Sequence, residues 1–100
     1  MKKVQPAPLD EIIALMVGAI RKPDRLEWYV PKIISAILSL PDNTSNNDVM
    51  DRLQELAWDL DHFEANEAER LRCGFMDAAS TVKEIENALR DLERFGVCAP

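Results

Sequence analysis

Four stretches of the chain place apolar residues three and four positions apart, which is the spacing that lines one face of an α-helix. The first stretch follows Pro8 and closes at Lys22-Pro23, and its apolar set is Leu9, Ile12, Ile13, Met16, Val17 and Ile20. Because proline suits the first turn of a helix and a Lys-Pro step ends one, the pattern predicts a helix over residues 8–21. Asp24 is expected to cap the next segment, since its carboxylate can accept a backbone hydrogen bond.

The second stretch contains Pro31, which lacks a backbone N–H and clashes with the preceding helical turn. We therefore expect a short turn of helix before this proline and a longer helix after it, ending near Pro41. Apolar residues surround nearly the whole of the longer helix, at Ile33, Ile34, Ile37, Leu38 and Leu40. A helix that is apolar on most sides is buried, so this element is predicted to be the most buried of the chain.

A polar loop over residues 41–47, PDNTSNN, separates the second stretch from the third, because Pro, Asp, Asn and Ser all favour turns. Asn47 is the predicted cap of the third helix, which is expected over residues 48–64. The apolar stripe of this helix consists of Val49, Leu53, Leu56, Leu60 and Phe63, with Ala57 beside it. Continuing the stripe would turn Glu67 and Gly74 inward, so a turn is predicted near Ala65-Asn66.

The last helix carries its own stripe, made by Leu71, Phe75, Ala78, Val82, Ile85, Leu89 and Leu92. Its start has two candidate positions, because Asn66 with Glu69 forms a capping pair, whereas Gly74 weakens the first turns and favours a start near Asp77. Gly96 is predicted to cap its C-terminus. Four helices with short connections imply an all-α fold, a single-domain antiparallel four-helix bundle over residues 1–100, with a flexible arm at 1–7 and a flexible tail at 97–100.

Composition agrees with helices, and the charge is concentrated in one region. Of the 100 residues, 47% are apolar and only 3 are Gly, and the net charge is -6. Residues 42–70 hold nine Asp and Glu against two Arg, which is a local charge of -7. Such a region repels nucleic-acid phosphate and anionic membranes, and attracts a basic protein surface. The alternative is that these acids form a solvated helix face.

The sequence contains no motif that predicts a catalytic, metal or cofactor site. Cys73 and Cys98 are the only cysteines, which favours reduced thiols in a cytoplasm. Asp59 and His62 have the spacing of the carboxylate-histidine step of di-iron bundles, but the chain has no second histidine. No apolar run is long enough to span a bilayer, and the N-terminal region lacks a signal-peptide cleavage site.

Trp58 lies almost opposite the leucine stripe of the third helix on a helical wheel, among carboxylates. Either another segment, such as Trp28-Tyr29, covers it, or it is an exposed aromatic anchor ringed by acids, which is the composition of a protein-binding hot spot. The residues predicted to bind a protein partner are Glu55, Trp58, Asp59, Asp61, Glu64 and Glu67.

Residues 60–64, LDHFE, are followed by an acidic linker that ends at Arg70, and a further amphipathic segment runs from Val82 to Leu89. This arrangement resembles the colicin D immunity family of small bacterial self-protection proteins, in which an aromatic-Glu pair ends a helix before such a linker. Ala65 stands where that family commonly has proline. The resemblance implies an acidic helical bundle that caps the basic active site of a toxin nuclease by imitating the phosphates of its RNA substrate.

The charge and the resemblance together predict a cytoplasmic immunity protein that binds one cognate toxin domain, a basic nuclease or tRNase, one to one, and is not an enzyme. Nucleic acid, membrane, metal and cofactor are not among its expected partners. The alternative is a homodimeric structural or regulatory module that pairs through the C-terminal stripe at Ile85 and Leu89. A third possibility is a small metal-dependent hydrolase, because the Glu64–Glu67 step is similar to one carboxylate motif of all-α nucleotide pyrophosphohydrolases, although the second motif is not evident.

Overall fold

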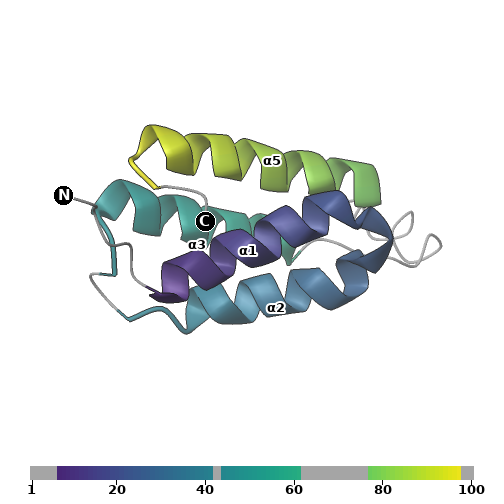
Figure 1. The fold of residues 1–100 in the computed structure, drawn as a ribbon, viewed down its shortest axis with the longest axis horizontal. Coiled ribbons are helices and arrows are strands. Elements are labelled where there is room, and N and C mark those ends of the chain that lie inside the picture. Colours follow the sequence, from purple (N-terminus) through teal and green to yellow (C-terminus); the bar gives the residue numbers. More distant parts are fainter. Residues whose placement is uncertain (1–6, 42–43, 62–76, 98–100) are drawn as a thin grey trace.

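The computed structural model describes residues 7–41, 44–61 and 77–97, and these form an antiparallel four-helix bundle (Figure 1). The elements are α1 (Ala7–Arg21), a 3-10 turn η1 (Pro23–Arg25), α2 (Leu26–Leu38), α3 (Asn47–Leu60) and α5 (Ala78–Arg94). No strand occurs in these parts of the chain. The predicted all-α fold class is therefore confirmed.

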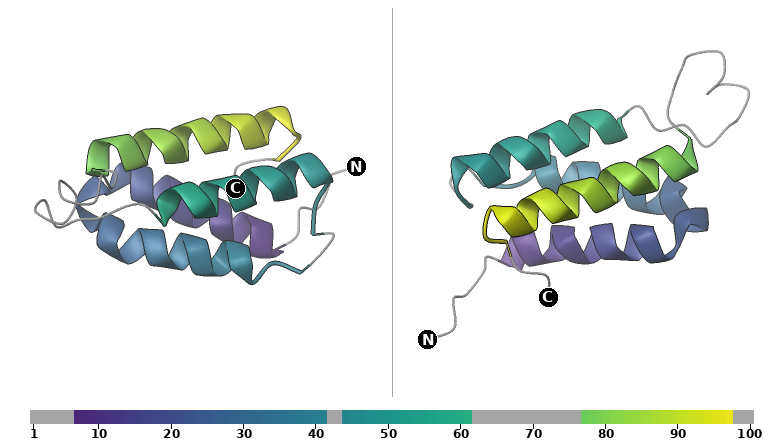
Figure 2. Two further views of the ribbon diagram at one scale, coloured as in Figure 1. Left: turned by 180° about the vertical axis from the view of Figure 1, so that it is seen from behind. Right: turned by 90° about the horizontal axis from the view of Figure 1, so that it is seen from above.

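The four helices form a closed ring in which each helix packs against two others. α1 packs against α2 and α5, and α3 packs against the same two helices from the opposite corner. Successive helices run in opposite directions along the bundle (Figures 1 and 2). One consequence is that the C-terminal end of α3 lies at the same end of the bundle as η1 and the start of α2.

The core is built from the inward stripe of each helix, and its buried apolar residues are Leu9, Ile12, Ile13, Met16, Ala19, Leu26, Val30, Ile33, Ile37, Val49, Leu53, Leu56, Ala57, Leu60, Ile85, Ala88, Leu92 and Val97. The expectation that the second stretch would be the most buried is wrong. Leu38 is 72% exposed, and α1 contributes more fully buried side chains than α2. Each helix of a four-helix ring has one side that faces solvent, and in α2 the apolar residue Leu38 lies on that side.

Pro31 does not interrupt α2, which contradicts the predicted break at this residue. The hydrogen bond that proline cannot donate would have gone to the carbonyl of Glu27, four residues earlier. Both residues are exposed, so water can satisfy that carbonyl. Asp24 is not a cap either, since it lies inside η1, and neither η1 nor α2 has a side-chain hydrogen bond at its N-terminus.

Asparagine and aspartate side chains cap the two helices of the second half. Asn46, and not the predicted Asn47, caps α3, because its Oδ1 accepts a 3.0 Å hydrogen bond from the backbone N–H of Val49. Asp77 caps α5 by accepting a 2.8 Å bond from the N–H of Ser80. Of the two starts considered for the last helix, the later one is therefore correct, and the alternative cap at residues 66–69 lies outside the described residues.

The ends of α1, α3 and α5 can be compared with the predicted ends. α3 ends at Leu60 rather than at residue 64. Gly96 is the predicted C-terminal cap of α5 and has a φ of 95°, with its N–H bonded to the carbonyl of Glu93. Val97, predicted to be in a flexible tail, is buried and donates to the carbonyl of Leu92 at 2.9 Å. Ala7, predicted to be in the arm, is the first residue of α1.

The buried face of α5 is rotated from the predicted stripe. Ala78 is exposed and Val82 and Leu89 are half-buried, whereas Thr81 and Ala88 join Ile85 and Leu92 in the interior. Thr81 can be buried because its hydroxyl donates a 2.8 Å hydrogen bond to the carbonyl of Asp77. Leu71 and Phe75 of the predicted stripe lie outside the described residues. None of the described helices is long and apolar enough to cross a membrane.

Candidate functional site

The outer face of α3 is the place where the predicted partner-binding residues gather. Leu53, Leu56 and Leu60 point into the core, so the opposite side of this helix faces solvent. Trp58 lies on that side and is 71% exposed. The interpretation that another segment of the bundle covers this indole is therefore wrong, and the tryptophan is presented on the surface.

Carboxylates flank Trp58 along the helix. Glu55 lies one turn before it and Asp61 one turn after it, and both are exposed, with 67% of the Glu55 side chain accessible. Asp51 adds a further exposed carboxylate two turns before the indole. Asp59 is half-buried at the edge of the same face. The described structure thus brings four of the six predicted residues together at the C-terminal half of α3.

The remaining predicted contact residues, Glu64 and Glu67, lie outside the described residues, as do His62 and Phe63. The turn predicted near Ala65-Asn66 therefore stays a prediction, and the Asp59–His62 spacing, which the sequence did not favour as a metal site, lies partly outside the described residues. Among residues 7–41, 44–61 and 77–97, no group of three Asp, Glu, His or Cys side chains is arranged to hold a metal ion.

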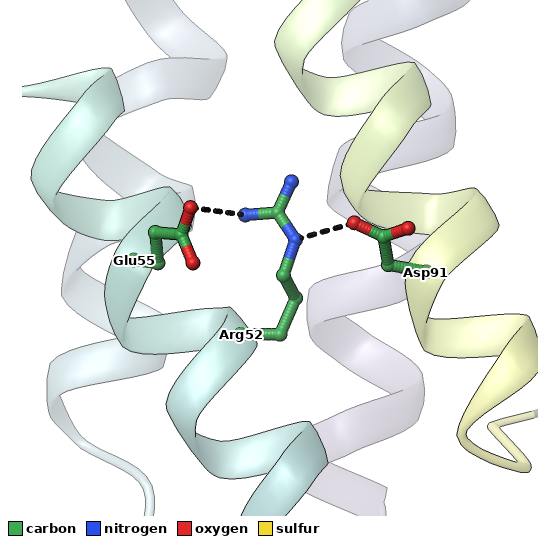
Figure 3. Close-up of polar contacts among 3 residues, drawn as sticks. All are labelled: Arg52, Glu55 and Asp91. Carbon is green, nitrogen blue, oxygen red and sulfur yellow. Dashed lines mark hydrogen bonds and ion pairs between the residues drawn. The ribbon is translucent and has the colours of Figure 1, made fainter.

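Arg52 has a structural role that charge counting along the sequence did not reveal. Its Nε donates a 2.8 Å hydrogen bond to Oδ2 of Asp91, which joins α3 to α5 (Figure 3). The Arg52 side chain is only 11% exposed, and its Nη1 lies 3.9 Å from Oε1 of Glu55. This Nη1 is buried without a hydrogen-bond partner. The two partners are 39 positions apart, so no local pattern could have paired them.

The pairing of Arg52 with Asp91 also affects the charge on the solvent-facing side of α3. Its guanidinium, the only basic group on α3, is held against α5. The exposed charged residues of this helix and its C-cap, Asp48, Asp51, Glu55 and Asp61, are all carboxylates. Among the described residues, the exposed charged side chains that α3 and its C-cap place around Trp58 are therefore all acidic. Such a surface can bury an aromatic anchor in a partner while its carboxylates accept hydrogen bonds from Lys or Arg.

Comparisons with known proteins do not assign a family to this chain. No family model, no curated protein and no solved structure matches it.

Proposed function

We propose that this protein is an immunity-type inhibitor that binds a basic toxin domain, a nuclease or tRNase, through the outer face of α3. The observation that carries the proposal is the 71% exposure of Trp58 on a helix whose described exposed charged residues are all carboxylates. The alternative, a solvated helix face, explains the exposed carboxylates but does not explain an exposed tryptophan among them. Exposed tryptophans carry a disproportionate share of binding energy at protein interfaces.

A basic partner follows from the charge of this face. A nuclease that grips phosphate carries Lys and Arg in its active site, and Asp or Glu side chains can occupy the positions of the phosphates. Opposite surface potentials also speed the encounter of two proteins, and added salt slows it. The resemblance of residues 50–92 to the colicin D immunity family supports the same kind of partner. The proposed location is the bacterial cytoplasm, and the proposed stoichiometry is one to one.

The homodimer alternative has less support from the described structure. It requires the C-terminal stripe to be available at the surface, yet Ile85 is 0% exposed and Leu89 is packed against the core. Pairing through these residues would require α5 to leave the bundle. The Glu64–Glu67 step on which the metal-dependent hydrolase rests lies outside the described residues.

The experiment is a titration of the purified protein against the toxin domain encoded beside its gene, with association followed at two salt concentrations. The test variant Asp59→Lys/Asp61→Lys reverses two charges on the α3 face. Glu86→Lys/Glu93→Lys on α5 is the matched control, since it makes the same charge change at two exposed positions on another helix. We expect the first variant to slow association at least tenfold and the control to have a much smaller effect.

The aromatic anchor is tested by Trp58→Ala, with Leu38→Ala, a change at an equally exposed large apolar residue of α2, as its control. Truncating a hot-spot tryptophan costs about 2 kcal/mol or more, which is roughly thirtyfold in Kd. Failure of the wild-type protein to bind would refute the proposal. Equal losses from the α3 and control variants would also refute it, because binding would then not depend on this face.

A further inference from the structure

A second aromatic site, of opposite charge, lies where η1 leads into α2. Lys22, Arg25, Trp28 and Tyr29 line an open cleft of about 200 Å³. Trp28 is 52% exposed although it is one of the largest apolar side chains in the protein. No residue of the proposed α3 face takes part in this cleft, so a role for the cleft does not rest on the proposed toxin inhibition.

The aromatic rings of the cleft are held in place by neighbouring residues. Trp28 and Tyr29 meet edge to face, with ring centroids 4.9 Å apart and an interplanar angle of 86°. The Nζ of Lys32 lies 4.6 Å from the centroid of the Trp28 ring. The Tyr29 ring lies against Gly18 of α1, where a Cβ would come within 2.7 Å of it. The cleft is therefore preformed, and it depends on the absence of a side chain at residue 18.

The charge around the cleft has the opposite sign to that of the α3 face. Residues 21–32 contain four Lys and Arg against Asp24 and Glu27, a local charge of +2. Two of the four bases, Lys22 and Arg25, line the cleft itself, and a third lies on its tryptophan. A basic toxin surface would be repelled here, whereas a carboxylate would be attracted.

We propose that this cleft is a second protein-contact site that takes an acidic side chain, Asp or Glu, from a segment of a protein partner. Its volume is below the range of about 300–1,000 Å³ that small-molecule sites occupy, and suits one anchoring side chain. Trp, Tyr and Arg are the residues most enriched at binding hot spots. The Arg25 guanidinium can hold a carboxylate with two parallel hydrogen bonds, and the two rings can cover the aliphatic stem of the same side chain.

The test uses the full-length, ¹⁵N-labelled protein, whose two indole N–H signals report the cleft (Trp28) and the α3 face (Trp58) separately. The probe is an acetylated and amidated peptide of alternating glycine and glutamate, and its control replaces each glutamate with glutamine. We expect the glutamate peptide to shift the Trp28 signal saturably, with a Kd on the order of 1 mM. The Trp58 signal, among carboxylates, should not move.

The matched variants are Lys22→Gln/Arg25→Gln in the cleft and Lys83→Gln/Arg90→Gln on α5, where both bases are exposed. The first pair should weaken the peptide about tenfold, and the second should leave it within about twofold. Far-UV circular dichroism of both variants verifies that the bundle is folded.

Three results would overturn this proposal. The first is no saturable shift of Trp28, and the second is an equal shift with the glutamine peptide or an equal loss in the α5 variant. The third is a shift produced by inorganic phosphate at lower concentration than by the glutamate peptide, because the cleft would then be a phosphate site and not a site for an acidic protein segment.

Discussion

The ion pair between Arg52 and Asp91 makes a stability prediction that depends on which partner is removed. Asp91→Ala leaves the guanidinium in a site where its side chain is only 11% exposed, with the Nε–H deprived of its 2.8 Å acceptor. A partly buried charge that keeps only the 3.9 Å contact with the exposed Glu55 carboxylate costs about 1.5–3 kcal/mol of folding free energy. Arg52→Met removes the charge and keeps an apolar side chain of similar length. It should therefore lower the free energy of unfolding by less than about 1 kcal/mol.

The magnitude can be measured by urea unfolding followed by far-UV circular dichroism. With a slope of about 1–1.5 kcal/mol per molar urea for a domain of this size, Asp91→Ala should lower the midpoint by about 1–3 M. It should also lower Tm by roughly 10 °C. In the double variant Arg52→Met/Asp91→Ala most of this loss should be recovered, because the uncompensated charge is gone.

Two outcomes would refute this reasoning. If the free energy of unfolding of Asp91→Ala lies within about 0.5 kcal/mol of the wild-type value, the pair behaves as an exposed surface ion pair. If Arg52→Met is as destabilising as Asp91→Ala, the cost comes from lost packing or from the pair itself and not from a stranded guanidinium. Glu55→Ala is the control, since Glu55 is mostly exposed and lies 3.9 Å from the same guanidinium, and it should change stability by less than about 0.5 kcal/mol.

Three further substitutions test the local structure in the same unfolding assay. Asn46→Ala should cost about 1 kcal/mol by removing the cap of α3, whereas Asn47→Ala, one residue inside the helix, should cost almost nothing; equal effects would contradict the cap assignment. Gly96→Ala should cost about 1 kcal/mol from its φ of 95° alone, because no atom lies within 4 Å of the added methyl group, and an unchanged midpoint would show that this backbone relaxes. Gly18→Ala should cost about 1–3 kcal/mol and shift the NMR signals of Tyr29, whose ring occupies the space of the new methyl group; unmoved signals would mean that the ring does not depend on Gly18.

Helix α3 carries both the proposed interface, on its outer side, and the Arg52–Asp91 pair that joins it to α5. Its inner side is held by the leucine stripe and by the Arg52–Asp91 pair, so its outer side is a rigid presenting surface for Trp58. A binding face on a rigid helix loses little conformational entropy when the partner docks. If the proposed partner binds this face, we expect Asp91→Ala to weaken that binding only by unfolding the protein, and to leave it unchanged at temperatures where the bundle remains folded.

Much of the fold could be predicted from the sequence because its signals are local. The three-four spacing of apolar residues is a property of one helix and predicts four of them, and the helix over residues 8–21 is correct to one residue. The glycine at residue 96 marks the end of α5 because only a residue without a side chain adopts a positive φ at low cost. The concentration of acids on α3 is likewise visible in the chain itself.

The remaining features depend on which residues meet in space, and these were decided by the tertiary structure. A helical wheel places Trp58 opposite the core, but whether that side is covered depends on where the neighbouring helices pass, and they pass elsewhere. Arg52 looks like one charge in an acidic run until α5 brings Asp91 to it. Thr81 replaces Ala78 on the buried face because packing against α1 and α3 sets the rotation of α5, and periodicity alone leaves that rotation free by a residue or two. The candidate site follows the same division. Its carboxylates could be read from the sequence, whereas the exposure of its tryptophan and the pairing of Arg52 with α5 required the bundle.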